Sequence, residues 1–269
     1  MKNLFDIKDK VVVLTGGCGI LGRNIAEYLV ENGAKVAILD LNEEQGKELE
    51  AQLQQKGDAL FLKTNVLDKD ILTQNRKDIV DKFGHIDILL NAAGGNMAGA
   101  TIPPDKTFLD LDLGAFEKVV QLNLFGTIIP TQVFVPELVK RDKAAIVNFC
   151  SETALRPLTR VVGYGAAKAA VGNYTRYMAT ELAKKFNPNV RVNAIVPGFL
   201  ITNQNRALLT NPDGSLTQRG KDIIAHTPTG RFADPDELFG TIHYLISDAS
   251  SFVTGVLAVV DGGFDVYSI

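Results

Sequence analysis

The apolar residues of this chain fall in short continuous runs that are separated by longer amphipathic stretches. Strands that are apolar without alternation are typical of a parallel sheet covered by helices on both faces. The runs predict strands at residues 11–15, 35–39, 60–64, 86–91, 145–149, 190–196 and 256–260. The amphipathic stretches predict helices at residues 22–31, 43–56, 68–83, 115–140, 164–186 and 234–247.

The regular alternation of strand and helix predicts an α/β fold, a Rossmann-type doubly wound parallel sheet of about seven strands with helices on both faces. Because no linker, low-complexity stretch or block of charge interrupts the pattern, residues 1–269 are interpreted as a single domain. Two irregular segments, 94–113 and 197–233, follow predicted strands. They should emerge at the carboxyl edge of the sheet, where ligands bind in this architecture. We expect residues 197–233 to cover a substrate.

Composition limits the kinds of partner. Of 269 residues, 46% are apolar and 22% are charged, and the net charge is −3. These values favour a globular fold, and the lack of a Lys/Arg cluster argues against nucleic acid or an anionic membrane as a partner. No apolar run approaches the roughly 20 residues that span a bilayer, and no signal core is seen near Met1. Two distant cysteines form no disulfide framework, which predicts the cytoplasm. The three histidines are scattered, which predicts no metal site.

A glycine-rich turn follows the first strand. Gly17, Gly19 and Gly22 form G-x-G-x-x-G between a strand and a helix. Glycines there allow positive φ and let the backbone approach a pyrophosphate, while the helix N-terminus offers free N–H groups. The alternative is a tight turn without a ligand. We assign cofactor contacts to Gly16, Gly17, Gly19, Ile20 and Leu21.

Asp40 ends the second predicted strand, roughly 20 residues after the turn, where a carboxylate accepts from both adenosine ribose hydroxyls. It would repel a 2′-phosphate, and Leu41 and Asn42 supply no cation to compensate. The alternative is an Asp that caps the next helix. The sequence therefore predicts NAD(H) rather than NADP(H).

Tyr164 and Lys168 are four residues apart, which places them on one face of a helix. A free Tyr has a pKa near 10. A cation about 4 Å from the phenolate, at an effective dielectric near 20, would stabilise it by roughly 4 kcal/mol and so lower that pKa by about three units. Ser151 follows a predicted strand and could donate to a substrate carbonyl oxygen. The alternatives are a surface Tyr/Lys pair and a serine that caps a turn.

With these residues in place, the chain resembles the short-chain dehydrogenase/reductase family over nearly its whole length. The resemblance is carried by the turn at 15–22, Asn91-Ala92-Ala93-Gly94, Asn123 within 122–126, the set Ser151, Tyr164 and Lys168, Pro197-Gly198 with Thr202, and Asp261-Gly262-Gly263.

The resemblance implies a catalytic set of four residues. Tyr164 would be the acid/base, Lys168 would lower its pKa and hold the nicotinamide ribose, and Ser151 would polarise the carbonyl. Asn123 would support a water-linked proton path. Further cofactor contacts are implied for Asn65, Val66, Asn91, Ala92, Gly94, Pro197, Gly198 and Thr202.

One position departs from the family's turn, T-G-x-x-x-G-x-G. Ile20 stands at the middle glycine position, and we expect its branched side chain to narrow the approach of the pyrophosphate or the nicotinamide. A subgroup that resembles D-mannonate oxidoreductase (fructuronate reductase) has a similar turn. It also resembles this chain at residues 94–96, 202–209 and 226–232.

The substrate is therefore expected to be a keto sugar acid. Asn203, Gln204 and Asn205 can donate to and accept from hydroxyls. Arg206 or Arg231 could hold the carboxylate through two parallel hydrogen bonds, unless they pair with nearby acids on the surface. Asn96 is a further substrate contact beside Ser151 and Tyr164, and Arg156 and Arg160 are second choices for the carboxylate.

Several alternatives stay open. Other substrates are a gluconate-type keto sugar acid or a 3-oxoacyl group. Non-enzymatic alternatives are a nucleotide-sensing binding protein on the same fold, or a scaffold subunit, neither of which needs the full catalytic set. The resemblance implies a small-molecule substrate and a homo-oligomer, either a tetramer or a dimer, formed through helices 115–140 and 164–186.

Overall fold

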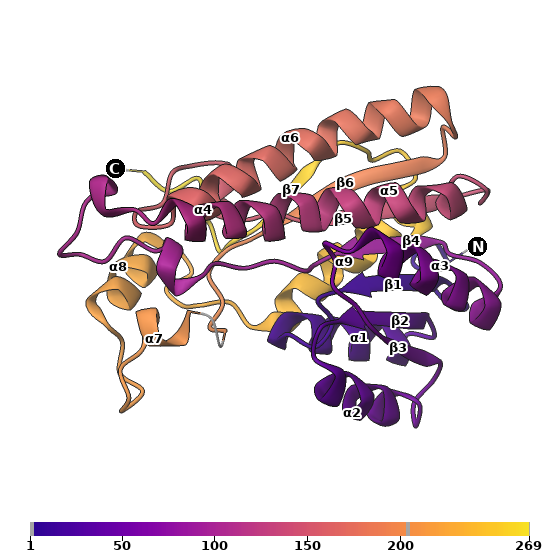
Figure 1. Cartoon of the computed structure of the whole chain (residues 1–269), viewed down its shortest axis with the longest axis horizontal. Helices are drawn as coiled ribbons and strands as arrows, with labels where there is room; N and C mark the ends of the chain where they lie inside the picture. Colours follow the sequence, from indigo (N-terminus) through magenta and orange to yellow (C-terminus); the bar gives the residue numbers. More distant parts are fainter. Residues whose placement is uncertain (1–2, 203–204, 269) are drawn as a thin grey trace.

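A computed structural model describes residues 3–202 and 205–268. The described chain forms a seven-stranded sheet in the order β3-β2-β1-β4-β5-β6-β7 (Figure 1). All neighbouring strands are parallel. The predicted fold class is thus confirmed. The strands are β1 Val11–Thr15, β2 Lys35–Asp40, β3 Ala59–Lys63, β4 Ile88–Asn91, β5 Ala144–Phe149, β6 Val190–Pro197 and β7 Leu257–Val260.

Helices cover both faces of the sheet because the strands are apolar on both faces. Along β1, Val12 and Leu14 join one core cluster, whereas Val11 and Val13 join the other. The first cluster is covered by α1 Ile20–Glu31, α2 Glu43–Leu53 and α9 Phe239–Ile246. The second is covered by α3 Lys69–Phe83, α5 Gly126–Leu138 and α6 Val162–Lys185.

The strand order reverses between β1 and β4, which places a ligand-binding crevice at their carboxyl ends. Thr15, the last residue of β1, holds the two strand ends together. Its hydroxyl accepts from the backbone N–H groups of Ala92 and Ala93, both at 3.1 Å. The segments that follow β1 and β4 therefore start next to each other.

The helix predicted at 115–140 is divided in three. It comprises α4 Leu113–Val120, a π-helical turn η3 at Gln121–Phe125, and α5. The stretch Leu113–Leu138 is long and apolar enough to cross a membrane by length and composition, but half of its most apolar window is buried. Phe134 and Leu138 are fully buried against the sheet. It is therefore packed as a core helix of this domain.

The segment 197–233 is less irregular than predicted. It contains α7 Arg206–Leu209 and α8 Gln218–His226, which lie together at one end of the molecule (Figure 1). The Thr217 hydroxyl caps α8 by accepting from Gly220 N at 3.1 Å. Short 3₁₀ turns occur at η1 Ala98–Ala100, η2 Phe108–Asp110, η4 Glu152–Ala154, η5 Pro235–Leu238 and η6 Asp248–Ser250.

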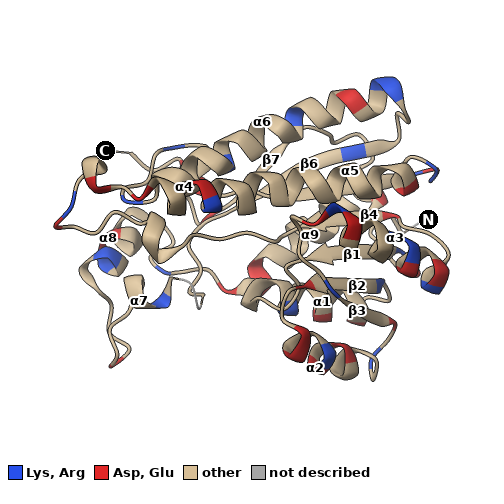
Figure 2. Ribbon diagram, in the orientation of Figure 1, with Lys and Arg blue, Asp and Glu red and all other residues tan. Residues whose placement is uncertain are grey.

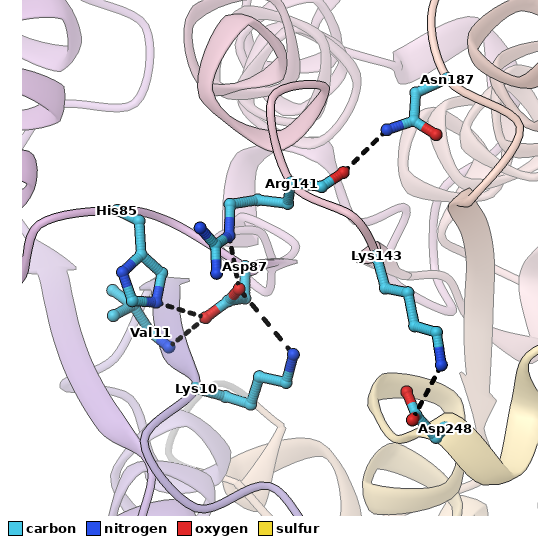
Figure 3. Close-up of polar contacts among 8 residues, drawn as sticks. All are labelled: Lys10, Val11, His85, Asp87, Arg141, Lys143, Asn187 and Asp248. Atoms are coloured by element: carbon cyan, nitrogen blue, oxygen red, sulfur yellow. Dashed lines mark hydrogen bonds and ion pairs between the residues drawn. The ribbon is translucent and has the colours of Figure 1, made fainter.

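The amino edge of the sheet is closed by a buried carboxylate (Figure 3). Asp87 precedes β4 and is almost completely buried. Its carboxylate accepts from Val11 N and from Arg141 Nε, each at 2.9 Å, and lies 3.0 Å from His85 Nε2. A buried charge is tolerated when it is paired and hydrogen-bonded in this way. This network stabilises the edge opposite to the crevice.

Candidate functional site

A pocket of about 960 Å³ opens at the carboxyl edge of the sheet. Its walls come from the glycine turn, the segments after β4 and β5, the start of α6 and the segment after β6. The predicted site residues that line it are Gly16, Gly19, Ile20, Leu21, Asp40, Asn65, Val66, Ala92, Gly94, Asn96, Ser151, Tyr164, Lys168, Pro197, Gly198, Thr202 and Asn205. Those that do not line it are Gly17, Asn91, Asn123, Arg206 and Arg231.

The glycine turn is shaped mainly by close packing within the protein. Gly16 has φ +69°, and a Cβ there would lie 2.7 Å from Ala93 Cα. A Cβ on Gly17 would meet Ile38 Cγ2 at 2.6 Å, and one on Gly22 would overlap Gly16 O. The expectation of positive φ at Gly17, Gly19 and Gly22 is wrong, because Gly16 alone in the turn has it. Gly19 is extended, with φ −64° and ψ 163°, because it is the N-cap of α1, and Gly22 lies within the right-handed helix that begins at Ile20.

Gly19 differs from its neighbours because the protein itself leaves room for a side chain there. It caps the N-terminus of α1 with φ −64°, and the nearest heavy atom to an added Cβ would be Gly16 O at 3.6 Å. That Cβ would instead occupy the mouth of the pocket, beside the free N–H groups of the first helical turn. This cradle fits a pyrophosphate. Ile20 lies on the same wall, and the narrowing that it would cause stays a prediction.

Asp40 is held in a fixed orientation at the end of β2. Its carboxylate accepts from Cys18 N at 2.9 Å and from Asn42 N at 3.0 Å. The cap of α2 is Asn42, whose side chain accepts from Gln45 N at 3.1 Å. Asp40 is therefore not the helix cap, and its oriented carboxylate lines the pocket with further acceptor capacity for ribose hydroxyls.

Ser151, Tyr164 and Lys168 come together where β5 ends and α6 begins. The Ser151 hydroxyl accepts from Thr153 N at 3.3 Å and is hydrogen-bonded to Tyr164. Lys168 is buried; its Nζ donates to Phe149 O at 2.7 Å and lies 5.6 Å from the centroid of the Tyr164 ring. The serine thus caps a turn and also faces the phenol.

The protonation states differ from the expectation that Lys168 lowers the pKa of Tyr164. Burial raises the pKa of Tyr164 to about 12, although the hydrogen bond with Ser151 opposes this. Burial also lowers the pKa of Lys168 to about 8. Desolvation is the largest cause for both groups, and the ammonium donates its hydrogen bond to the Phe149 carbonyl. At neutral pH Tyr164 is a neutral phenol, which can donate a proton.

Two predicted contacts lie behind the pocket wall. Asn123, in the π-helical turn, accepts from Gly95 N at 3.0 Å and donates to Gly95 O at 2.7 Å. A Cβ on Gly94 would lie 2.7 Å from Asn123 Oδ1 and 3.2 Å from Lys168 Nζ. The Asn123 amide and the Lys168 ammonium therefore both lie against Gly94, close to each other. Asn91 is buried and donates to Thr131 Oγ1 at 3.0 Å. The Asn123 side chain therefore positions the segment after β4, and the Asn91 side chain links β4 to Thr131 and Asn148.

The two arginines that were expected to hold a carboxylate are elsewhere. Arg231 is exposed and donates twice to Glu237, both at 2.6 Å, and Arg206 is exposed on α7. Neither residue lines the pocket, so this geometry does not support their role in holding a carboxylate, which stays a prediction. Asn205 lines it, but its amide holds its own loop by accepting from Thr202 N and donating to Leu200 O, each at 2.7 Å. Asn203 and Gln204 lie outside the described residues.

Several pocket residues were not predicted as first choices. Glu152 and Thr153 follow Ser151 in η4, and Arg219 lies near the start of α8. Arg160, a second choice, lines the pocket, whereas Arg156 pairs with Asp265 at 3.1 Å. The threonine cap before Gln218 was a usable signal for α8.

Glu152 is a buried acid with unusual surroundings. It is 1% exposed, and within residues 3–202 and 205–268 neither carboxyl oxygen has a hydrogen-bond partner. Burial raises its pKa to about 8, and the charges of Asp261 and Asp265 raise it further while Arg156 opposes them. Near neutral pH the group is therefore largely protonated.

Glu152→Gln is expected to stabilise the protein in alkaline solution. A carboxyl whose folded-state pKa is raised to about 8 contributes stability that is present below its unfolded pKa, near 4.3, and lost as pH rises through the folded value. The variant should be more stable than wild type by about 2–4 kcal/mol at pH 8.5, and nearly equal to it at pH 4.5. Urea unfolding at both pH values measures this. Glu44→Gln, on the exposed face of α2, is the control, and parallel pH profiles for wild type and Glu152→Gln would refute the expectation.

Comparisons with known proteins agree with this geometry. A family model described as enoyl-(acyl carrier protein) reductase matches residues 19–265. The uncharacterised oxidoreductase UxuB of Bacillus subtilis is 40% identical over 273 residues, covering 98% of this chain and 97% of its own. A crystal structure of a "putative D-Mannonate oxidoreductase" from Haemophilus influenza with bound NAD has a TM-score of 0.91 at 39% identity, covering 98% and 97% of the two chains. A "putative gluconate dehydrogenase" from Agrobacterium tumefaciens has a TM-score of 0.87 at 28% identity, covering 99% and 100%.

Proposed function

We propose that this chain, which belongs to the short-chain dehydrogenase/reductase family, interconverts a keto sugar acid and its alcohol, namely D-fructuronate and D-mannonate. It is an NAD(H)-dependent oxidoreductase that acts on CH–OH groups. The sugar acid is proposed because the most similar structures described above include proteins named for D-mannonate and for gluconate.

The observation that carries the substrate class is a set of unpaired polar atoms that belong to residues of the pocket that Tyr164 also lines. Buried oxygens of Asn96, Glu152 and Thr153 have no hydrogen-bond partner among the described residues, and all three residues line the pocket. Buried polar atoms are normally hydrogen-bonded, because leaving one unpaired costs about 1–3 kcal/mol. A substrate with several hydroxyls would satisfy them, whereas a 3-oxoacyl chain would leave them unpaired.

The proposed mechanism assigns a separate task to each residue. Bound NADH supplies the hydride for the carbonyl carbon. Tyr164, a neutral phenol, donates its proton to the carbonyl oxygen, and the Ser151 hydroxyl donates a hydrogen bond to that same oxygen. Lys168 holds the nicotinamide ribose, and Asn123 keeps the segment after β4 in place beside the ammonium. The carbonyl gains one hydride and one proton, which gives the alcohol.

The remaining assignments are also proposals. Because the family resemblance implies it, we propose a homo-oligomer, a tetramer or a dimer, formed through the outer faces of α4, α5 and α6. We propose the cytoplasm as the location, because Cys18 and Cys150 are both free thiols, as is usual in a reducing compartment.

A substrate panel with NADH tests the proposed function. D-Fructuronate, 5-ketogluconate and an acetoacetyl thioester are compared at matched concentrations, and NADH oxidation is followed by absorbance. We expect D-fructuronate to have the highest kcat/KM, by about tenfold or more, which is a difference of about 1.4 kcal/mol in barrier. A higher value for 5-ketogluconate would replace the proposed substrate with another sugar acid. A higher value for the thioester would overturn the sugar-acid class.

A further inference from the structure

We infer that Arg160 and Arg219 together form the binding site for the substrate carboxylate, an inference that rests on the proposed function for the identity of the ligand. The two arginines come from segments far apart in the sequence, the loop before α6 and the start of α8. Both line the pocket that Ser151 and Tyr164 also line. Figure 2 shows basic residues on α8, at the end of the molecule beyond the sheet.

Arg160 is anchored by its backbone and by its side chain. Its Nε donates to Ile102 O at 2.9 Å, and its own carbonyl accepts from Ile102 N at 3.0 Å. Its φ of +76° is in the left-handed region, which a long side chain adopts at a cost. Strain of this kind persists where surrounding contacts hold the residue, and it concentrates at ligand-binding sites. The Arg160 guanidinium is thus held at the pocket wall by the backbone carbonyl of Ile102.

Arg219 docks α8 onto the loop that carries Arg160. Its Nη1 donates to Thr159 Oγ1 at 3.0 Å and its Nη2 donates to Thr159 O at 3.3 Å. The neighbouring acid on α8, Asp222, accepts instead from Gln218 Nε2 at 2.7 Å. Arg219 is therefore fixed beside Arg160 by neutral acceptors.

The two guanidinium groups repel each other, and neither forms an ion pair with a carboxylate among the residues that the structure describes. Within the described ranges neither arginine has an acid within 4.0 Å, whereas Arg156 and Arg231 each have one. Burial lowers the pKa of Arg219, and the charge of Arg160 lowers it further, although Asp222 opposes this. Two like charges at a pocket wall favour a bound anion, because a carboxylate can accept from both and remove the repulsion.

The charge arrangement also favours Arg160 and Arg219 over Arg231 for this role. Arg231 already has its carboxylate, Glu237, so an incoming acid would have to displace it. Among the described residues, Arg160 and Arg219 donate to uncharged oxygens, so a substrate carboxylate adds a charge-assisted bond without breaking an ion pair. Such bonds are worth about 1.5–3 kcal/mol, or roughly 10- to 100-fold in affinity.

A binding experiment tests the site without turnover. The NADH-saturated enzyme is titrated calorimetrically with D-mannonate and with its uncharged counterpart, D-mannitol. In Arg219→Gln and Arg160→Gln, which remove the charge but keep amide donors, D-mannonate should bind roughly 10- to 100-fold more weakly, and D-mannitol should bind as to wild type. Arg219→Lys should recover part of the loss, because it restores the charge without the planar fork. Arg231→Gln is the matched control and should bind both ligands normally.

The outcomes separate the two proposals. If both glutamine variants bind D-mannonate as wild type does while D-fructuronate is turned over, the arginine site is wrong and the proposed function stands. If D-fructuronate is not turned over but D-mannonate binding still depends on both arginines, the carboxylate site stands and the reaction is wrong. If wild type does not distinguish D-mannonate from D-mannitol, the carboxylate site is overturned whatever the turnover. Unchanged NADH affinity and thermal unfolding in the variants confirm that the fold is intact.

Discussion

Tyr164→Phe is expected to lower kcat for D-fructuronate reduction by about 10³-fold, within the range of 10²–10⁴ typical of a lost general acid. The substitution removes only the phenolic oxygen and keeps the ring at the pocket wall. Because the Tyr164 pKa is raised to about 12, the wild-type group is protonated at neutral pH and can donate to the carbonyl oxygen. Steady-state kinetics measure the loss, and calorimetric titration with NADH should show an affinity close to that of wild type.

Tyr174→Phe is the matched control for this prediction. Tyr174 lies on the same helix, α6, and burial likewise raises the pKa of its phenol to about 12, but it does not line the pocket. Its loss should leave kcat within a few-fold of wild type. If Tyr164→Phe kept more than about a tenth of kcat, or if both variants lost activity equally, Tyr164 would not be the proton donor.

The wild-type enzyme is expected to favour NADH over NADPH by at least about 10²-fold in kcat/KM. The Asp40 carboxylate is fixed by Cys18 N and Asn42 N, so it cannot turn away from a 2′-phosphate. Two like charges about 4 Å apart, at an effective dielectric near 20, repel by roughly 4 kcal/mol. Steady-state kinetics with both cofactors measure the preference.

A double substitution should reverse that preference. Leu41 is exposed and lines the pocket beside Asp40, so Leu41→Arg introduces a cation that can grip a phosphate. Asp40→Ser with Leu41→Arg should use NADPH better than NADH, while Leu41→Arg alone should keep a preference for NADH. A preference for NADPH in the wild type, or an unchanged preference in the double variant, would contradict the role of Asp40.

The sheet and the cofactor turn could be predicted from the sequence because their signals are local. The central strands β1 and β4 are short, almost continuously apolar runs that are buried on both faces, and this signal needs no information from the rest of the chain. The glycine turn is recognisable because a close approach excludes side chains: a Cβ on Gly16 would lie 2.7 Å from Ala93 Cα. The ribose-binding role of Asp40 is predicted in the same way, because the residue ends the strand that comes one crossover after the turn.

Some site residues could not be assigned from the sequence because their partners are distant in the chain. The motifs around Asn91 and Asn123 predict that both residues lie at the site. In the structure the Asn91 side chain is hydrogen-bonded to Thr131 and the Asn123 side chain to Gly95. An arginine in the segment 197–233 can either face a ligand or form an ion pair with a nearby acid. The sequence alone does not show that Arg231 forms its ion pair with Glu237.

What the sequence by itself determined is the fold class, the cofactor edge of the sheet and the presence of Ser151, Tyr164 and Lys168 near one another, since each depends on residue type at short spacing. The tertiary structure decided the charge state and the specificity. Burial, and not the neighbouring ammonium, sets the pKa of Tyr164. The docking of α8 on Thr159 brings Arg219 beside Arg160. Desolvation and ion pairing depend on which segments meet in space, and spacing along the chain does not contain that information.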